Sequence, residues 1–503
     1  MAQKSGDIYQ EALSARVVND VFDPIRHHPF NRRLIVASSR GPFYFTEDDA
    51  GELVARHAVE SFEGNSGSSI TWIYGAISAA DRKAAQLMAS SDNNILASVK
   101  PDRWDIRLVS PPRRVHHKFY NVICNPLLWF LLHRSWSPTF TPVIGKQEHD
   151  AWDNGYRAVN ESYANEVLAS AGEERFVLVT SNYQLMLVPG FVRDRHPDAV
   201  IRHSFETPWP WPSDLEILPV EWRLQLLHSL LSVNELSFPM ARDIRAFAAC
   251  AEEFLKESAV VTIEHNSVSI TYEERIVRLE IAQPSVRPVD FKSLKGISPT
   301  QRAVNDLTAD KYRHTFVTVD RAEPHKNIVR SINAFGELLK QSPEMAQDVQ
   351  FLLFLTLGPT HISAYKRLLE EVRRAARRVN DRFDGLNPVR VNEDSTIYRA
   401  VAALSIYDTL VSIPVIDGTV RSAMDGAIIN SVSGGMIVSE TSIAADLFGE
   451  FVSTVGFADI NAIANAMAAA IGESDEDRRR KAHAIEAIAS SIYEGQMSMQ
   501  IMT

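Results

Sequence analysis

The sequence predicts an α/β protein with two doubly wound domains that face each other across a cleft, and three observations lead to this prediction. The chain has 503 residues, which is too long for one ordinary domain. Short apolar runs alternate with stretches of helical periodicity, a pattern typical of parallel sheets covered on both faces. This alternation occurs twice, once before about residue 250 and once after about residue 310.

Nine apolar runs have the length and composition of strands. They span residues 34–39, 70–76, 175–181, 199–205, 230–238, 314–320, 349–357, 408–415 and 434–440. Helix-length patterns lie between many of them, and the clearest span residues 155–172, 327–342 and 362–383. The order of strands and helices therefore favours two sheets of the doubly wound type.

The domain limits follow from shifts in pattern along the chain. We expect a polar N-terminal extension, a first Rossmann-like domain, a second Rossmann-like domain and a C-terminal helix, at residues 1–31, 32–284, 285–475 and 476–503. Residues 260–282 alternate with period two and predict short strands around a turn. Because two prolines follow directly, we interpret this stretch as the crossing between the domains.

Charge and cysteine content narrow the class of protein. The net charge is -11 and neither domain shows a basic stripe in its sequence, so we expect no nucleic-acid partner. Cys124 and Cys250 form neither a disulfide framework nor a metal-ligand pattern, which fits a reducing cytoplasm. The N-terminal residues lack the apolar core of a signal peptide, and the longest apolar runs fall short of the ~20 residues that span a bilayer. We therefore expect a cytoplasmic protein without a membrane partner.

Two cations follow the predicted strand 314–320. Arg321 and Lys326 lie five residues apart, where the strand gives way to a helix that begins near Asn327. An arginine fork, a lysine ammonium and a helix N-terminus together suit a phosphate-rich ligand. The alternative that both cations are merely solvated on a loop stays open.

A second candidate site lies in residues 411–429. Asp417 and Gly418 form a turn after a strand, and a helix is expected to start near Thr419. Backbone N–H groups at that helix start would suit a diphosphate, and Asp425, expected two turns along the helix, would reach a ribose hydroxyl. By itself such a turn is also a common connecting element.

Other polar residues follow predicted strands directly. Ser439 and Thr441 precede a helix, where a simple N-cap would also explain them. In the first half of the chain, the residues in this position are Arg40, Asn182 and Glu206. Ligands of doubly wound sheets bind beyond the carboxyl ends of the strands, so these positions together favour a binding site.

The residues at these positions carry a family resemblance. RLIVASSRGP, KFYNVICNPLLWFLLHR, ETPWPWPSDLEILP, VDRAEPHKN, IDGTVRSAMDG and SETSIAADLFGE resemble, in order and spacing, the motifs of the trehalose-6-phosphate synthase family (GT20) over roughly residues 32–490. That family consists of retaining glycosyltransferases with the GT-B fold. The forms EPHKN and SETSIAADLFGE resemble more closely a divergent branch, the pseudo-glycosyltransferases similar to validamycin's coupling enzyme, which join a nucleotide-activated cyclitol to an aminocyclitol phosphate.

The resemblance implies roles for individual residues. It implies catalytic roles in holding the donor diphosphate and sugar for Arg321, Lys326 and Asp417. It implies donor binding by Gly51, Glu206, Gly418, Thr419, Val420 and Asp425. It implies acceptor binding by Arg40, Tyr120, Trp129 and Asn182.

Several positions depart from the family pattern. Gly51–Glu52 stands where the family has a glycine pair, and Asn182 stands where it has an aspartate. Glu206 replaces a histidine, and Asp425 replaces a glutamate that is one methylene longer. These departures argue against ordinary trehalose 6-phosphate synthesis and imply a changed donor, acceptor or both.

The expected function is therefore transfer of a sugar or cyclitol from a nucleotide diphosphate donor to a phosphorylated or amine-bearing acceptor, in a specialised pathway such as antibiotic biosynthesis. Protein cations would stabilise the leaving diphosphate, so we expect neither a metal nor another cofactor. A non-catalytic GT-B protein that binds a sugar phosphate as a regulator or scaffold is the alternative. The sequence leaves open the nucleotide base, the two substrates and whether the protein forms a homo-oligomer.

Overall fold

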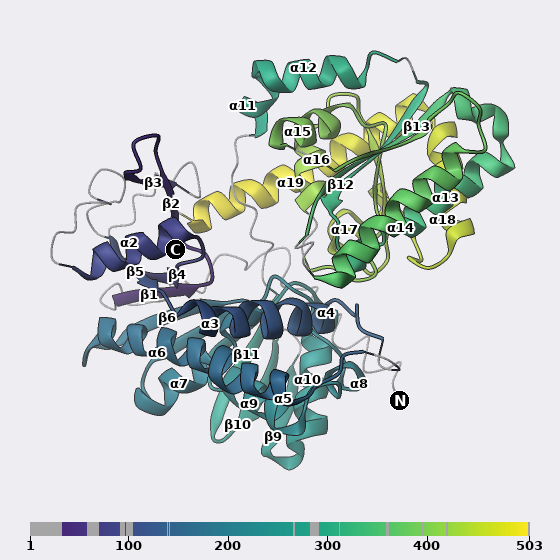
Figure 1. Cartoon of the computed structure of the whole chain (residues 1–503). Helices are drawn as coiled ribbons and strands as arrows, with labels where there is room; N and C mark the ends of the chain where they lie inside the picture. The colour runs from purple at the N-terminus through teal and green to yellow at the C-terminus, as the bar shows by residue number, and fades with distance from the viewer. Residues whose placement is uncertain are drawn as a thin grey trace. The chain divides into compact units, whose positions relative to one another are not determined.

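The computed structural model describes residues 33–57, 70–90, 96, 104–137, 139, 141–264, 267–281, 291–310, 312–358, 362–393, 396–418 and 421–500, without the side chains of 291, 292 and 493–500. The chain divides into two compact units (Figure 1). The first comprises Met1–Ser285 with Ser498–Thr503, and the second comprises Val286–Met497. The predicted extension at residues 1–31 lies outside the described residues.

The first unit contains a nine-stranded sheet in the order β5-β4-β1-β6-β7-β8-β11-β10-β9. Its strands from β5 to β8 are parallel, as buried apolar runs joined by helices require. A separate hairpin pairs β2 with β3. The strands are β1 (Arg33–Ser38), β2 (Phe43–Glu47), β3 (Leu53–His57), β4 (Ile70–Gly75), β5 (Trp104–Val109), β6 (Phe176–Ser181), β7 (Val200–Ser204), β8 (Glu235–Phe238), β9 (Ala259–Glu264), β10 (Ser267–Tyr272) and β11 (Arg275–Ile281).

Helices cover this sheet. α6 packs against β1, β4 and β5, whereas α10 packs against β8, β9 and β11. Wide π-type turns extend α3 and α6 at His117–Leu128 and Trp152–Arg157. The α-helices are α2 (Ala79–Ala89), α3 (Arg113–His116), α4 (Trp129–Leu132), α5 (Lys146–Ala151), α6 (Ala158–Ala171), α7 (Val188–Arg195), α8 (Pro212–Leu215), α9 (Val220–Leu230) and α10 (Ala241–Leu255).

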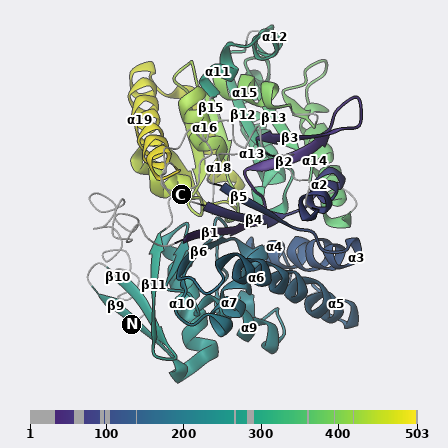
Figure 2. The same cartoon turned by 90° about the vertical axis from the view of Figure 1, so that its left-hand side faces the viewer.

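The predicted crossing at residues 260–282 belongs to the first sheet, so that interpretation is wrong for this stretch. β9, β10 and β11 form an antiparallel meander (Figure 2). β11 also pairs in parallel with β8. The strand prediction itself is confirmed, because Val268, Ile270 and Tyr272 alternate into the core. The proline-containing stretch that follows, 282–290, lies outside the described residues.

The second unit contains a six-stranded parallel sheet in the order β14-β13-β12-β15-β16-β17. The strands are β12 (His314–Arg321), β13 (Val349–Thr356), β14 (Val389–Asn392), β15 (Thr409–Ser412), β16 (Gly435–Ser439) and β17 (Ser453–Val455). The strand β13, which lies between β14 and β12, is buried along almost its whole length, and this burial explains its uninterrupted apolar sequence.

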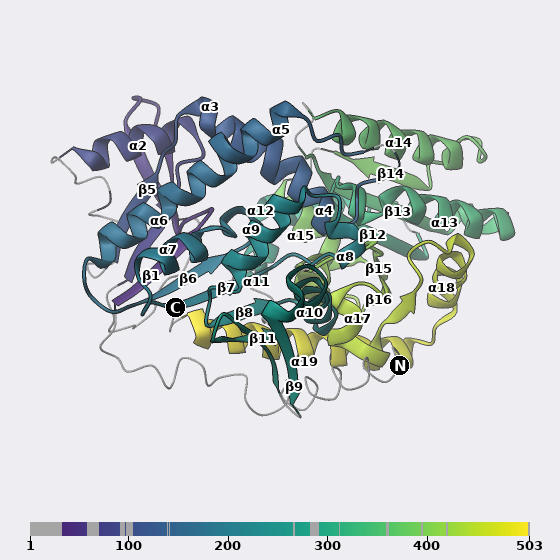
Figure 3. The same ribbon diagram turned by 90° about the horizontal axis from the view of Figure 1, so that it is seen from below.

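Helices lie on both faces of the second sheet, with α13, α14 and α18 on one face and α15 and α16 on the other (Figures 1 and 3). The two predicted doubly wound α/β units are thereby confirmed. The helices are α11 (Phe291–Gly296), α12 (Ser298–Leu307), α13 (Ile328–Gln341), α14 (Ser363–Asn380), α15 (Ile397–Ile406), α16 (Arg421–Ile429), α17 (Ile443–Phe448), α18 (Ile460–Gly472) and α19 (Asp475–Gln500).

The helix α14 buries an apolar stripe and exposes charged residues on its other side. The exposed cations are Lys366, Arg367, Arg373, Arg374, Arg377 and Arg378, with the exposed carboxylates of Glu370 and Glu371 among them. Arg373 is paired with Glu393. This side of α14 therefore carries mixed charge with a basic excess.

Among the described helices, none combines the length and the apolar character that crossing a membrane would require.

Candidate active site

In the second unit, two loops meet at the carboxyl end of the sheet. One follows β12 and leads into α13, and the other follows β15 and leads towards α16. The backbone N–H of Val415 donates to the carbonyl oxygen of His325 at 2.7 Å, which ties the loops together. Since β12 and β15 are neighbours, the side chains of both loops gather at one edge, as expected for a ligand site in this type of sheet.

Lys326 is the centre of this edge. Its ammonium lies 2.6 Å from Oδ2 of Asp417 and 2.8 Å from Oδ1 of Asp320. All three side chains are largely buried, with the lysine side chain 8% exposed. The structure thus joins Lys326 and Asp417 as the sequence suggested, and it adds Asp320, which sequence reasoning missed although this residue immediately precedes Arg321.

Burial and charge act in opposition within this triad. Burial disfavours the ammonium of Lys326, but the carboxylates of Asp320 and Asp417 outweigh that effect and raise its pKa. Burial also raises the pKa of Asp320, and the nearby ammonium only partly offsets it. Lys326 is therefore a fixed cation whose charge is balanced by internal carboxylates, not a mobile one that waits in solvent.

Arg321 has a more open position. One guanidinium nitrogen lies 3.4 Å from Oε1 of Glu323, and the arginine side chain is half exposed, whereas that of Glu323 is buried. Both predicted cations therefore contact carboxylates, but the side chain of Lys326 is buried and that of Arg321 is half exposed. Arg321 is placed to exchange its contact for a ligand anion at lower cost, because its guanidinium already reaches solvent.

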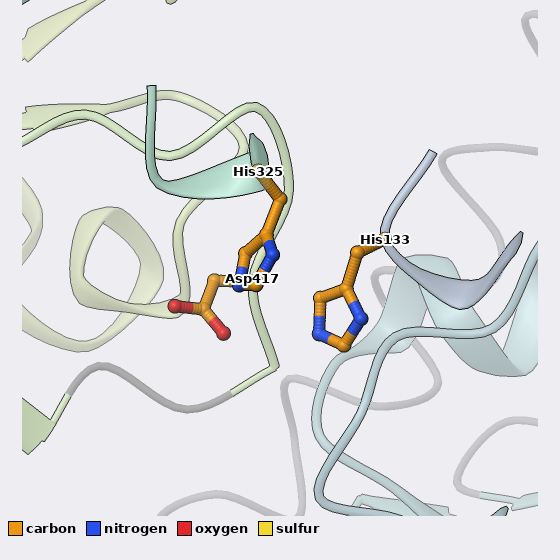
Figure 4. A group of neighbouring side chains, drawn as sticks. All are labelled: His133, His325 and Asp417. Carbon is orange, nitrogen blue, oxygen red and sulfur yellow. The ribbon is translucent and has the colours of Figure 1, made fainter. Parts of the chain in front are cut away.

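His325 is a second residue that the sequence reasoning missed. Figure 4 shows its imidazole beside the carboxylate of Asp417, and the potential ligand atoms of these two side chains lie within 4.8 Å of one another. His325 is 1% exposed. His325 lies between Pro324 and Lys326, in the loop singled out from the sequence, and this position could have identified it as a candidate. The same figure labels His133, which belongs to the first unit. In that unit, Nδ1 of His133 hydrogen-bonds with the carbonyl oxygen of Trp129 at 2.9 Å.

Asp425 lies in α16, four residues after Arg421, and the two residues before Arg421 lie outside the described residues. Its carboxylate is buried, and its Oδ1 finds no hydrogen-bond partner within the described ranges. Nη2 of Arg421 lies 3.9 Å from Oδ2 of Asp425. Burial raises the pKa of Asp425 to about 7, although Arg421 acts in the opposite direction. A buried carboxylate without a full set of partners is suited to bind a hydroxyl group.

The remaining predicted residues of this edge are placed only in part. Gly418 is buried next to Asp417, whereas Thr419 and Val420 lie outside the described residues. Ser439 and Thr441 both donate to the carbonyl oxygen of Pro414, at 2.7 and 3.1 Å. The N-cap of the following helix is Ser442. These two hydroxyls therefore brace the loop after β15.

In the first unit, Asn182 and Glu206 form a reciprocal pair. The amide nitrogen Nδ2 of Asn182 donates to Oε2 of Glu206 at 3.2 Å, and the backbone N–H of Glu206 donates to Oδ1 of Asn182 at 2.9 Å. Asn182 follows β6 and Glu206 follows β7, which are adjacent parallel strands. The family resemblance implied acceptor binding for Asn182 and donor binding for Glu206. Because the two residues are hydrogen-bonded to each other, they lie at the same point of the sheet edge.

The other residues of the first unit are distributed around this edge. Trp129 packs against Tyr183, the residue after Asn182, with ring centroids 5.6 Å apart. Arg40 is exposed and follows β1, the neighbour of β6. Tyr120 stacks on His116 at 5.9 Å. Trp129 and Asn182 thus share a neighbour, and Arg40 follows a strand of the same sheet edge.

Gly51 has a local structural explanation. It lies in the turn between β2 and β3 with a φ of +79°, a conformation that favours glycine. Its backbone N–H donates to the carbonyl oxygen of Asp48 at 2.9 Å. The turn accounts for this glycine by itself, and donor binding by Gly51 stays a prediction.

Comparison with known proteins identifies the family to which this chain is similar. The family described as "Glycosyltransferase family 20" matches residues 31–494. The validamine 7-phosphate valienyltransferase of Streptomyces hygroscopicus subsp. jinggangensis is 25% identical over 82% of this chain and 81% of its own length. The glucosylglycerol-phosphate synthase of a Synechocystis strain is 22% identical over 77% of this chain and 80% of its own.

Solved structures agree in fold. A trehalose-phosphate synthase from Burkholderia xenovorans in complex with glucose-6-phosphate has a TM-score of 0.73 at 18% identity, covering 93% of this chain and 100% of its own. The E. coli structure bound with UDP-2-fluoro glucose also has a TM-score of 0.73 at 18% identity, covering 93% of this chain and 99% of its own. The GT-B fold and the family expected from the sequence are confirmed. The chain belongs to glycosyltransferase family 20, and it is a glycosyltransferase.

Proposed function

We propose that the protein transfers a sugar or cyclitol from a nucleotide diphosphate donor to a phosphorylated or amine-bearing acceptor, in a specialised biosynthetic pathway in the cytoplasm. The observation that carries this proposal is the gathering of Arg321, Lys326 and Asp417 at the carboxyl end of the second sheet. The names of two relatives support it, since a validamine 7-phosphate valienyltransferase and a glucosylglycerol-phosphate synthase both involve phosphorylated compounds.

The donor diphosphate would lie against the half-exposed guanidinium of Arg321. An arginine fork accepts two phosphate oxygens at once, and it neutralises the negative charge that grows as the bond from the donor ring to the phosphate breaks. Because this charge is larger in the transition state than in the ground state, the contact would accelerate the reaction and not only tighten binding.

Lys326 would act in a different way. Its ammonium contacts both Asp320 and Asp417, so its direct role would be to hold the Asp417 carboxylate in one orientation. Asp417 would then accept hydrogen bonds from hydroxyls of the donor ring, and the buried Asp425 would do the same for the ribose. Each group is fixed before the substrate arrives, which lowers the cost of reorganisation.

Release of nucleoside diphosphate tests this proposal. Wild-type protein is incubated with glucose donors of UDP, GDP, ADP and dTDP and with a panel of sugar and aminocyclitol phosphates. With the best pair, Arg321→Ala is expected to lower the turnover number by about 100- to 1,000-fold, as for other single transition-state contacts. The matched control is Arg382→Ala, which removes an exposed arginine elsewhere in the same unit and should retain wild-type turnover. Equal activity of Arg321→Ala and wild type would refute the role of Arg321.

A further inference from the structure

The pair of Asn182 and Glu206 is a built feature and not a chance surface contact. The backbone N–H of Glu206 holds the amide oxygen of Asn182, and the amide nitrogen of Asn182 in turn holds the carboxylate of Glu206. The Glu206 residue is exposed, whereas Asn182 is partly covered. The carboxylate is therefore presented at the sheet edge by a neighbour that limits how it can rotate.

The Asn182 side of the pair is rigid. Its backbone N–H donates to the carbonyl oxygen of Ser204 at 2.8 Å, and its φ of +64° is a conformation that residues other than glycine seldom adopt. The loop that follows is held by hydrogen bonds from α6 and from the π-type turn before it. The hydroxyl of Tyr156 donates to the carbonyl oxygen of Tyr183 at 2.6 Å, and Asn160 accepts from the N–H of Leu187 at 3.0 Å.

The Glu206 side is rigid as well. Three prolines follow within six residues, at positions 208, 210 and 212, and they restrict the backbone. The backbone N–H of Trp209 donates to Oδ1 of Asp243 at 3.1 Å, and the Trp209 ring is buried. A glutamate held between two anchored loops keeps its negative charge at a defined point, which is what specific recognition of a ligand group requires.

We propose that Glu206 selects an acceptor whose reacting group is an amine, and that Asn182 is the positioning residue that orients the Glu206 carboxylate for it. This inference rests on the proposed function, and it adds that this edge of the first sheet binds the acceptor. A carboxylate carries only acceptor oxygens and a negative charge, so it attracts an ammonium group more strongly than it attracts a neutral hydroxyl. The Asn182 amide donates to Oε2 and leaves the charge of the carboxylate in place.

Binding is the suitable measurement for this inference. The nitrogen must lose a proton before it can attack the donor, since only the neutral amine has a lone pair, and turnover would therefore mix two opposing effects of pH. We suggest calorimetric titration of wild-type protein, in the presence of the nucleoside diphosphate that binds best, with validamine 7-phosphate as the amine and glucose 6-phosphate as the hydroxyl compound.

The expected result separates the two acceptors. Glu206→Gln should weaken binding of validamine 7-phosphate by about 10- to 100-fold, the loss typical of a hydrogen bond to a charged group, and should change binding of glucose 6-phosphate by less than about threefold. In wild type, affinity for the amine should fall as pH rises through the pKa of its ammonium, and this fall should vanish in Glu206→Gln. The control Glu174→Gln removes an exposed carboxylate before the amino end of β6 and should bind as wild type does.

Asn182→Gly tests the positioning role while it preserves the backbone, because glycine tolerates a positive φ. It should lower the preference for the amine over the hydroxyl compound without changing the unfolding temperature by more than a few degrees.

Equal losses for both acceptors, or unchanged amine binding in Glu206→Gln, would overturn the inference. Release of nucleoside diphosphate with hydroxyl acceptors alone would also overturn it while leaving the proposed function intact. A wild-type protein that binds no nucleotide would instead overturn the proposed function.

Discussion

Replacing Asp425 by asparagine should remove a pH-dependent loss of stability from the second unit. The Asp425 carboxylate is buried, and its pKa is raised from 3.8 to about 7 chiefly by burial. Because the folded state binds this proton more tightly than the unfolded chain does, stability is highest below the unfolded pKa. It declines as pH rises through the folded value.

The size of the effect follows from the two pKa values. The interval from 3.8 to about 7, at 1.36 kcal/mol per pH unit, corresponds to about 4 kcal/mol of stability lost when the carboxylate is fully ionised. About 2.5 kcal/mol of this loss should occur between pH 5 and pH 8. Asparagine has nearly the same shape and no charge, so Asp425→Asn should lack this component and should gain stability relative to wild type as pH rises.

Hydrogen exchange in increasing urea is a suitable assay, because a chain with two units need not unfold in one step. Peptides from β12 and β13 report the free energy of unfolding of the second unit. The measured quantity is the difference between variant and wild type at pH 5, 6, 7 and 8. Asp384→Asn removes an exposed carboxylate from the same unit and serves as the control.

The reasoning would be refuted if the difference between Asp425→Asn and wild type stayed constant from pH 5 to pH 8. A difference that shrank with rising pH would contradict it as well, because that result would mean that the ionised form is favoured by the fold.

Two other substitutions test the electrostatics of the same unit. Lys326→Met should lower the free energy of unfolding by about 3–5 kcal/mol, because it leaves the buried carboxylates of Asp320 and Asp417 facing each other. Adding Asp417→Asn should recover part of that loss. No recovery would contradict the electrostatic coupling of these three residues. Burial, with help from Arg478 and Arg313, lowers the pKa of His314 from 6.5 to about 4, so His314 by itself should remove about 3 kcal/mol of stability as pH drops from 6.5 to 4, while Asp425 acts in the opposite direction. The free energy of unfolding of His314→Gln relative to wild type, measured by urea titration, should therefore rise by about 3 kcal/mol as pH drops over this range, and a constant difference would count against it.

The central strands were predictable because their sequences are unambiguous. β13 is apolar along almost its whole length, since both of its faces are covered, and the predicted and observed limits nearly coincide. The limits of β12, β1 and β6 also nearly coincide with the predicted ones. Apart from β9, the edge elements were not recognised. β5, β14, β17 and the β2–β3 hairpin are short or have mixed composition, because a strand with one neighbour has less need of apolar residues.

The candidate site could be predicted by position but not by contact. Residues that directly follow strands could be read from the sequence, which is why Arg321, Lys326, Asn182 and Glu206 were named. Their partners could not be read in this way, because pairing depends on which strands are neighbours. Asp320 reaches Lys326 across one loop, and Asp417 reaches it because β15 lies next to β12.

Two expected roles illustrate the same limit. Lys326 was expected to present its charge to a ligand, and its contacts with the carboxylates of Asp320 and Asp417 could not be read from the linear pattern. Gly51 was assigned by analogy with a glycine pair; its positive φ explains why the hairpin turn favours glycine, and donor binding by Gly51 stays a prediction. In both residues, local geometry decides what the side chain or backbone is available to do.

The central claim is that a nucleoside diphosphate binds beside Arg321 in the second unit. The most direct measurement is calorimetric titration of wild type and Arg321→Ala with UDP, GDP, ADP and dTDP. At least one of these nucleotides should bind wild type, and Arg321→Ala should weaken its affinity by about 10-fold or more, as loss of a charged contact does. Binding of equal affinity in both proteins, or no binding of any nucleotide by wild type, would contradict a nucleotide site beside Arg321.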